Sequence, residues 1–120
     1  MNRELRREFA ASLTSRAAAL TKPLLRGARN PEEHTWREIQ LIAHNVAGVA
    51  ASYGFAHLGR SAERLDDWID VLARLAVASG AWPGSGKRSL LRGVKLARRF
   101  RRALISCGES LPSESKAGSS

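Results

Sequence analysis

Residues 41–66 read LIAHNVAGVAASYGFAHLGRSAERLD, and this stretch decides the fold class. On both sides of Gly54, apolar and small residues recur every three or four positions, which is the spacing of one buried face of an α-helix. A glycine at such a place is typical of a helix end, because it adopts a left-handed backbone conformation without strain. The stretch therefore predicts two amphipathic helices joined by a tight turn.

The same period occurs four times in the chain of 120 residues, over residues 3–25, 30–53, 56–79 and 87–106. The alternation that marks a β-strand is almost missing. Amphipathic helices joined by short loops favour antiparallel neighbours. We therefore expect an all-α protein, an antiparallel up-down four-helix bundle, over residues 1–107. The tail, residues 108–120, is small and polar, and we expect it to be disordered.

His44 is predicted to point away from the core. The inner stripe of its helix consists of Trp36, Ile39, Ala43, Val46, Ala50 and Tyr53. At about 100° per residue, His44 lies about 130° from the centre of that stripe. The other residues of this outer face are Arg37, Gln40, Ala47, Gly48 and Ala51.

Gly48 lies one helical turn after His44 on the outer face. A glycine inside a helix is less favourable than alanine by about 1 kcal/mol. We therefore interpret Gly48 as clearance for a partner that approaches the imidazole closely. The two other histidines, His34 and His57, are interpreted as ordinary surface residues.

These residues resemble the signature of histidine-containing phosphotransfer (HPt) domains. That signature is close to AH-x-L-K-G-[SA]-[AS]-x-x-x-G-[AF]-x-x-L, followed by a Leu-Glu pair on the next helix. Ala43 and His44 match its start, and Val46 stands for the leucine. The further matches, without a gap, are Gly48, Gly54, Phe55 and Leu58, with Leu65 and Asp66 for the Leu-Glu pair. Ala47 departs from the pattern, which has a lysine beside the phosphorylated nitrogen.

The resemblance implies a phosphohistidine carrier of a two-component phosphorelay rather than an autonomous enzyme. His44 would be the phosphoacceptor, since a neutral imidazole is a good nucleophile near pH 7. It would exchange the phosphoryl group with an aspartate of a response-regulator receiver domain, and the outer face around it would dock that receiver or a hybrid histidine kinase. The chain would need no metal or cofactor, because Mg²⁺ is expected on the receiver. With Ala47 in place of lysine, Arg60 or Arg64 could supply positive charge.

Two alternatives remain open at this point. The net charge is +9, and no acidic residue occurs from Val71 to Gly108. A basic nucleic-acid-binding bundle acting through residues 87–106 is therefore one alternative, although aromatic side chains that stack on bases are almost missing there. The other is a non-catalytic adaptor that docks a receiver or a kinase without phosphoryl transfer, and Ala47 favours it.

The remaining features are interpreted more simply. The acidic residues Glu63, Asp66, Asp67 and Asp70 are interleaved with arginines and predict a solvated face with ion pairs such as Asp70 to Arg74. The single cysteine, Cys107, excludes an internal disulfide. No run reaches the roughly 20 apolar residues of a membrane helix, and the N-terminus lacks the apolar centre of a secretory signal. We expect a cytoplasmic monomer.

Overall fold

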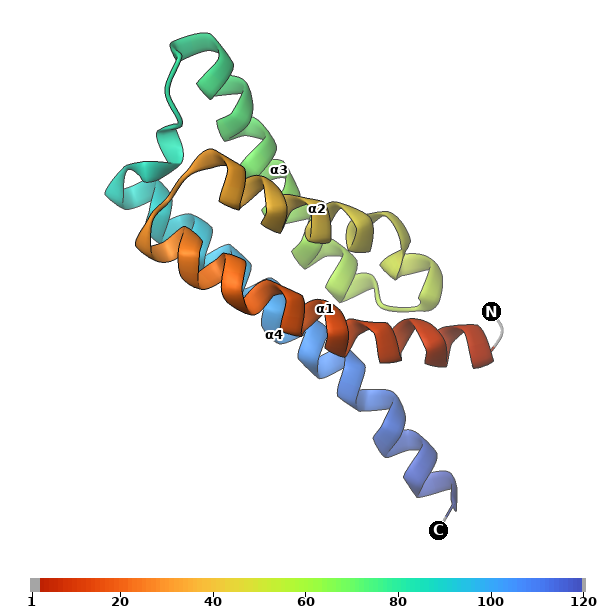
Figure 1. Ribbon diagram of the computed structural model, residues 1–120. Coiled ribbons are helices and arrows are strands. Elements are labelled where there is room, and N and C mark those ends of the chain that lie inside the picture. Colours follow the sequence, from red (N-terminus) through yellow and green to blue (C-terminus); the bar gives the residue numbers. More distant parts are fainter. Residues whose placement is uncertain (1–2, 120) are drawn as a thin grey trace.

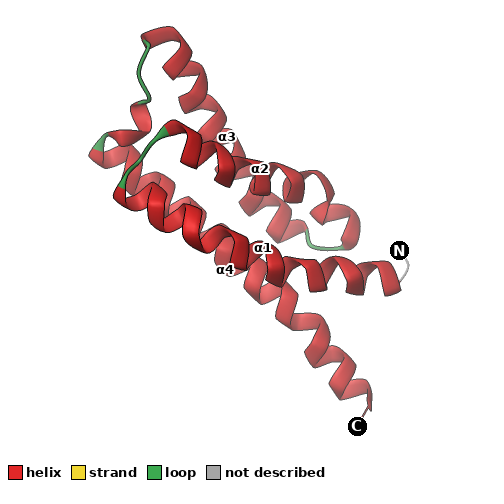
Figure 2. Cartoon of the chain, in the orientation of Figure 1, coloured by secondary structure: helices red, strands yellow, loops and turns green. Residues whose placement is uncertain are grey.

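A computed structural model describes residues 3–119, and the side chains of residues 3–109. Over this range the chain forms four α-helices (Figure 1), namely α1 (Arg3–Arg29), α2 (Glu33–Val49), α3 (Ala56–Ser79) and α4 (Lys87–Ser119). Two short 3-10 segments, η1 (Ala50–Tyr53) and η2 (Pro83–Ser85), lie in the connections. Figure 2 shows only helices and loops in the described part of the chain. The all-α prediction is therefore confirmed.

Each helix packs against two others around a shared core. α1 contacts α2 and α4, and α3 contacts α2 and α4. The largest fully buried side chains come from all four helices, and include Leu13, Leu20, Trp36, Ile39, Leu58, Leu65, Ile69, Phe100 and Leu104. Burial of each such side chain contributes on the order of 1.5–3 kcal/mol. The apolar stripes are thus what hold the four helices together.

The second helix follows its predicted stripe but has different ends. Residues Trp36, Ile39, Ala43, Val46 and Ala50 are fully buried, as predicted, and Tyr53 is half-buried. α2 begins at Glu33 rather than at Asn30, because the amide of Asn30 still bonds to the Arg26 carbonyl at the end of α1. It gives way to η1 after Val49, and Gly54 then ends the segment with a left-handed φ of 87°.

Two predicted helix ends are wrong because the glycines concerned serve packing. α1 continues through Gly27, where a β-carbon would lie 3.2 Å from the Trp36 ring. α4 continues through Gly108, where a β-carbon would lie 3.0 Å from the Thr14 hydroxyl of α1. Both glycines let two helices approach closely. The helix boundary predicted near Ser106 is therefore wrong, whereas the division into a domain of residues 1–107 and a tail of residues 108–120 stays a prediction.

The beginning of α1 holds the turn between α2 and α3. The Arg6 side chain donates a hydrogen bond of 3.0 Å to the Tyr53 carbonyl and lies 5.0 Å from the centre of the Phe55 ring. The Phe9 and Tyr53 rings are stacked with their centres 4.4 Å apart. The turn that connects α2 to α3 is therefore held in place by contacts with α1.

Candidate functional site

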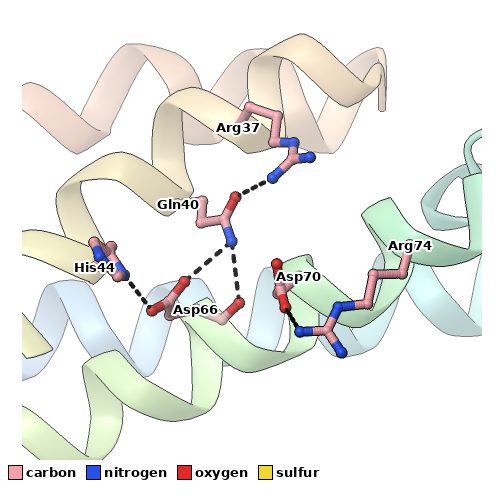
Figure 3. Close-up of polar contacts among 6 residues, drawn as sticks. All are labelled: Arg37, Gln40, His44, Asp66, Asp70 and Arg74. Carbon is pink, nitrogen blue, oxygen red and sulfur yellow. Dashed lines mark hydrogen bonds and ion pairs between the residues drawn. The ribbon is translucent and has the colours of Figure 1, made fainter. Parts of the chain in front are cut away.

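His44 lies on the exposed surface of α2 and forms a hydrogen bond with Asp66 of the neighbouring helix α3. Its side chain is 71% exposed, and its Nδ1 atom lies 2.8 Å from Oδ2 of Asp66, whose side chain is only 16% exposed. Figure 3 shows the imidazole and this carboxylate turned toward each other. The outward orientation predicted from the helical period is confirmed by this exposure.

The pairing with Asp66 selects one form of the imidazole. An ionised carboxylate can only accept hydrogen bonds, so the Nδ1 atom of His44 must donate. In the neutral ring the other nitrogen, Nε2, then carries the lone pair. The contact between α2 and α3 therefore defines which nitrogen is nucleophilic, and it leaves that nitrogen on the side away from Asp66.

Two further side chains of α2 extend this contact into a chain of hydrogen bonds. Gln40 donates from Nε2 to Oδ1 of Asp66 at 3.0 Å and to the Asp66 carbonyl at 3.4 Å. Arg37 donates to Oε1 of Gln40 at 2.8 Å, which orients the amide, and it also lies 3.6 Å from the Glu33 carboxylate. Both oxygens of the Asp66 carboxylate are thus occupied (Figure 3). The carboxylate is held before any partner arrives.

The surface beside His44 is open at Gly48. This residue is exposed, and a β-carbon built on it would meet no atom within 4 Å. Ala51 is also exposed, whereas Ala47 is half-buried and packs against the core. The outer face predicted from the sequence therefore consists of an open part, Gly48 and Ala51, and a hydrogen-bonded part, Arg37 and Gln40.

Arg60 and Arg64 are not brought to His44. Both side chains line a cavity between α3 and α4. Around α3 they lie about 120° and about 160° from Asp66, the residue that contacts the imidazole. The expectation that these arginines supply charge beside His44 has no support in this geometry.

Asp66 is the site residue that the sequence prediction missed. It was assigned to a solvated acidic face, and that assignment is wrong for this residue because its carboxylate is largely buried against His44 and Gln40. The ion pair predicted within the same face, Asp70 to Arg74, is present at 2.7 Å. Two signals in the sequence point to Asp66. One is its match to the acidic residue of the HPt signature, and the other is its position next to Leu65, since a residue adjacent to the buried stripe lies at the edge of a helix–helix contact.

The two other histidines lie on the surface, outside the chain of hydrogen bonds around His44. His34 is exposed and pairs with Glu32 at 3.2 Å, and His57 is exposed on α3. In the described part of the chain, no group of three His, Cys, Asp or Glu side chains is arranged to hold a metal ion. Of the helices searched over the same residues, none has the length and apolar character needed to cross a membrane.

Comparison with known families shows a match that spans most of the chain. The model of the Hpt domain matches residues 4–104, and this range includes α2 and α3, nearly all of α1 and the first part of α4. No curated protein and no solved structure matches the chain significantly. The matched range contains both halves of the hydrogen-bonded pair, His44 and Asp66. The chain therefore belongs to the Hpt domain family, whose members take part in histidine phosphotransfer of two-component systems.

Proposed function

We propose that the protein is a phosphorelay intermediate in which His44 carries the phosphoryl group. The single observation that supports this most strongly is the exposed imidazole whose Nδ1 atom is held by Asp66 at 2.8 Å. A receiver domain, or a hybrid kinase that contains one, would dock on the face formed by Arg37, Gln40, Ala47, Gly48 and Ala51. The direction of transfer depends on which partner carries the phosphoryl group first.

In the proposed step, Nε2 of His44 attacks the phosphorus of an aspartyl phosphate on the receiver. The new N–P bond forms as the P–O bond to the aspartate breaks, and the aspartate leaves as a carboxylate. The Nδ1 proton stays on the ring, where Asp66 accepts its hydrogen bond. The positive charge that develops on the imidazole is thereby stabilised, because a charge-assisted hydrogen bond is roughly twice as strong as a neutral one.

The other residues of the site act by positioning and clearance. Gln40 holds the Asp66 carboxylate and Arg37 orients Gln40, so the imidazole needs little reorganisation when a partner docks. Gly48 leaves room for in-line approach of the aspartyl phosphate. We infer that the chain itself needs no metal, with Mg²⁺ bound by the receiver. We also infer that the protein is a cytoplasmic monomer. We infer an antiparallel up-down bundle as well, and the alternating positions of the connections between helices in Figure 1 support this arrangement.

The test is phosphotransfer from receivers labelled with radioactive phosphate. Wild-type protein should acquire an acid-labile label, and His44→Gln should acquire none. His57→Gln is the matched control, because His57 is also exposed but lies outside the hydrogen-bonded chain. Equal labelling of the wild type and His44→Gln would refute the proposal.

A second variant tests the clearance at Gly48. Gly48→Arg should reduce transfer by at least about tenfold, since its side chain would extend over the imidazole, and far-UV circular dichroism should remain nearly unchanged. Binding of a receiver that survives His44→Gln, with no acid-labile phosphate on the wild type, would instead identify the adaptor.

A nucleic-acid-binding role is the second candidate, and one observation favours it. Arg88, Arg92, Lys95, Arg99 and Arg102 are all exposed and recur at helical spacing along α4. Such a stripe could contact successive phosphates. Fluorescence anisotropy with a labelled oligonucleotide should then show affinity that falls steeply with salt, and salt-independent binding would contradict this role.

A further inference from the structure

A cationic cavity lies between α3 and α4, apart from the histidine site. Its volume is about 380 Å³, within the range of small-molecule sites. Arg60 and Arg64 line it from α3, and Arg99 and Arg102 line it from α4. The two pairs of arginines thus face one partly open cavity from its two walls, and all four side chains are exposed.

The four guanidinium groups are not neutralised within the protein. No Asp or Glu is among the residues that line the cavity. Among the described residues, none of these four arginines forms an ion pair or a hydrogen bond. Like charges that face one cavity without a counterion repel each other, so an anion bound there would relieve this repulsion.

The remaining lining combines apolar surface, hydroxyl groups, the His57 imidazole and the Cys107 thiol. Leu96 and Ala103 of α4 supply apolar contacts, and both side chains are almost fully buried. Ser61 and Ser106 place one hydroxyl on each helix. A site of this composition fits a ligand that has an anionic part for the arginines and a less polar part for the wall.

We propose that this cavity binds a small organic molecule with two or more phosphate groups, of the nucleoside polyphosphate class. One guanidinium group can bind two phosphate oxygens at once. Four such groups match a compact polyphosphate better than they match an anion with a single charge. The concave shape favours a small ligand over nucleic acid, which would meet the exposed basic residues of α4 outside the cavity, Arg88, Arg92 and Lys95. Since the cavity lies on the side of α3 away from Asp66, its occupation is independent of phosphoryl transfer at His44.

The experiment is isothermal titration calorimetry of the full chain with adenosine triphosphate in the absence of divalent metal. We expect saturable binding with one site per chain, binding weaker by about fivefold or more for tripolyphosphate, which lacks the organic part, and no binding of adenosine. Arg64→Gln combined with Arg99→Gln should weaken adenosine triphosphate binding by at least about tenfold.

A matched double variant controls for net charge. Arg88→Gln combined with Arg92→Gln removes the same charge from exposed residues of α4 outside the cavity, and it should change the affinity by less than about twofold. Equal losses in the two double variants, or no saturable binding of any probe, would overturn the proposal. So would displacement of adenosine triphosphate by a single-stranded oligonucleotide whose binding depends on Arg88 and Arg92. His44→Gln should bind adenosine triphosphate as the wild type does, which separates this test from that of the phosphorelay.

Discussion

At the scale of single residues, the phosphoryl transfer proposed for His44 depends on a side chain from another helix. Its Nδ1 atom lies 2.8 Å from the Asp66 carboxylate, and Gln40 holds the second carboxylate oxygen. The nucleophilic nitrogen is therefore selected by a contact that α2 alone cannot supply. This dependence can be measured.

Asp66→Asn should slow phosphoryl transfer by roughly tenfold or more, because the neutral amide cannot stabilise the charge that develops on the imidazole. Single-turnover transfer from a labelled receiver measures the effect. Asp67→Asn is the control, since Asp67 is exposed and takes no part in the chain of hydrogen bonds around His44. Equal rates for Asp66→Asn and the wild type would show that the carboxylate has no role in the reaction.

Cys107 provides a second test at this scale. Burial raises the pKa of the Cys107 thiol above its ordinary value. A raised pKa keeps the thiol protonated in the folded state, so stability from this group is present below about pH 8.5 and declines as the pH rises toward the folded-state pKa. Alkylation by iodoacetamide at pH 8 should be slower for the folded chain than for the chain in urea. Identical rates would contradict the effect of burial.

The sequence predicts part of this site and misses part of it. The exposure of His44 follows from the helical period of α2, which requires only one helix. The role of Asp66 depends on the rotation of α3 against α2, and no periodicity in a single helix contains that information. Because the neighbouring Asp70 does pair with Arg74 along α3, the acidic residues resemble a solvated face when they are considered by their spacing alone.

At the scale of helices, the glycines have three different roles that sequence alone does not separate. Gly54 and Gly80 adopt positive φ values of 87° and 80° and end their segments. Gly27 and Gly93 lie inside helices and let aromatic rings approach, while Gly48 faces open space. The ends predicted at residues 53 and 79, next to Gly54 and Gly80, are therefore right. The helices predicted to end at residues 25 and 106 instead continue through Gly27 and Gly108.

A pair of substitutions distinguishes these roles. Gly93→Ala should destabilise the protein by about 1–3 kcal/mol, because its β-carbon would overlap the Trp68 ring and lie 3.1 Å from the Trp36 ring. Gly48→Ala should stabilise it by about 0.5–1 kcal/mol, because the new methyl group meets no neighbour and alanine favours the helix. Urea unfolding measures both changes, and a stabilising Gly93→Ala would disprove the close packing.

At the scale of the whole molecule, the pair of His44 and Asp66 and the basic stripe of α4 lie on different helices. The site around His44 is formed by α2 and α3, whereas α4 carries the basic stripe in a part of the sequence that has no acid from Val71 to Gly108. The helical fold class could be predicted, since four amphipathic periods leave few other ways to bury their stripes. The cavity between α3 and α4 could not, because it depends on how the two helices are spaced.

The net charge of +9 should make association with an acidic receiver depend on salt. The second-order rate of phosphoryl transfer should fall by about tenfold as the salt concentration rises from about 0.05 M to about 0.5 M. Phosphoryl-transfer reactions stopped at short times, at a receiver concentration far below saturation, measure this second-order rate. Arg92→Glu combined with Lys95→Glu should flatten this dependence while the rate at saturating receiver stays unchanged. A rate that is insensitive to salt would exclude electrostatic steering.

The support of His44 by only two of the four helices has an evolutionary consequence. Exposed basic residues of α4 do not contact His44 or Asp66, so their substitution should leave this pair intact. Electrostatic preference for one partner over another can then diverge among descendants of one ancestral gene. For the same reason, a protein engineer can change the two sets of residues separately. Exposed residues of α4 can be exchanged to alter the attraction of partners, while the residues of α2 and α3 around His44 are kept.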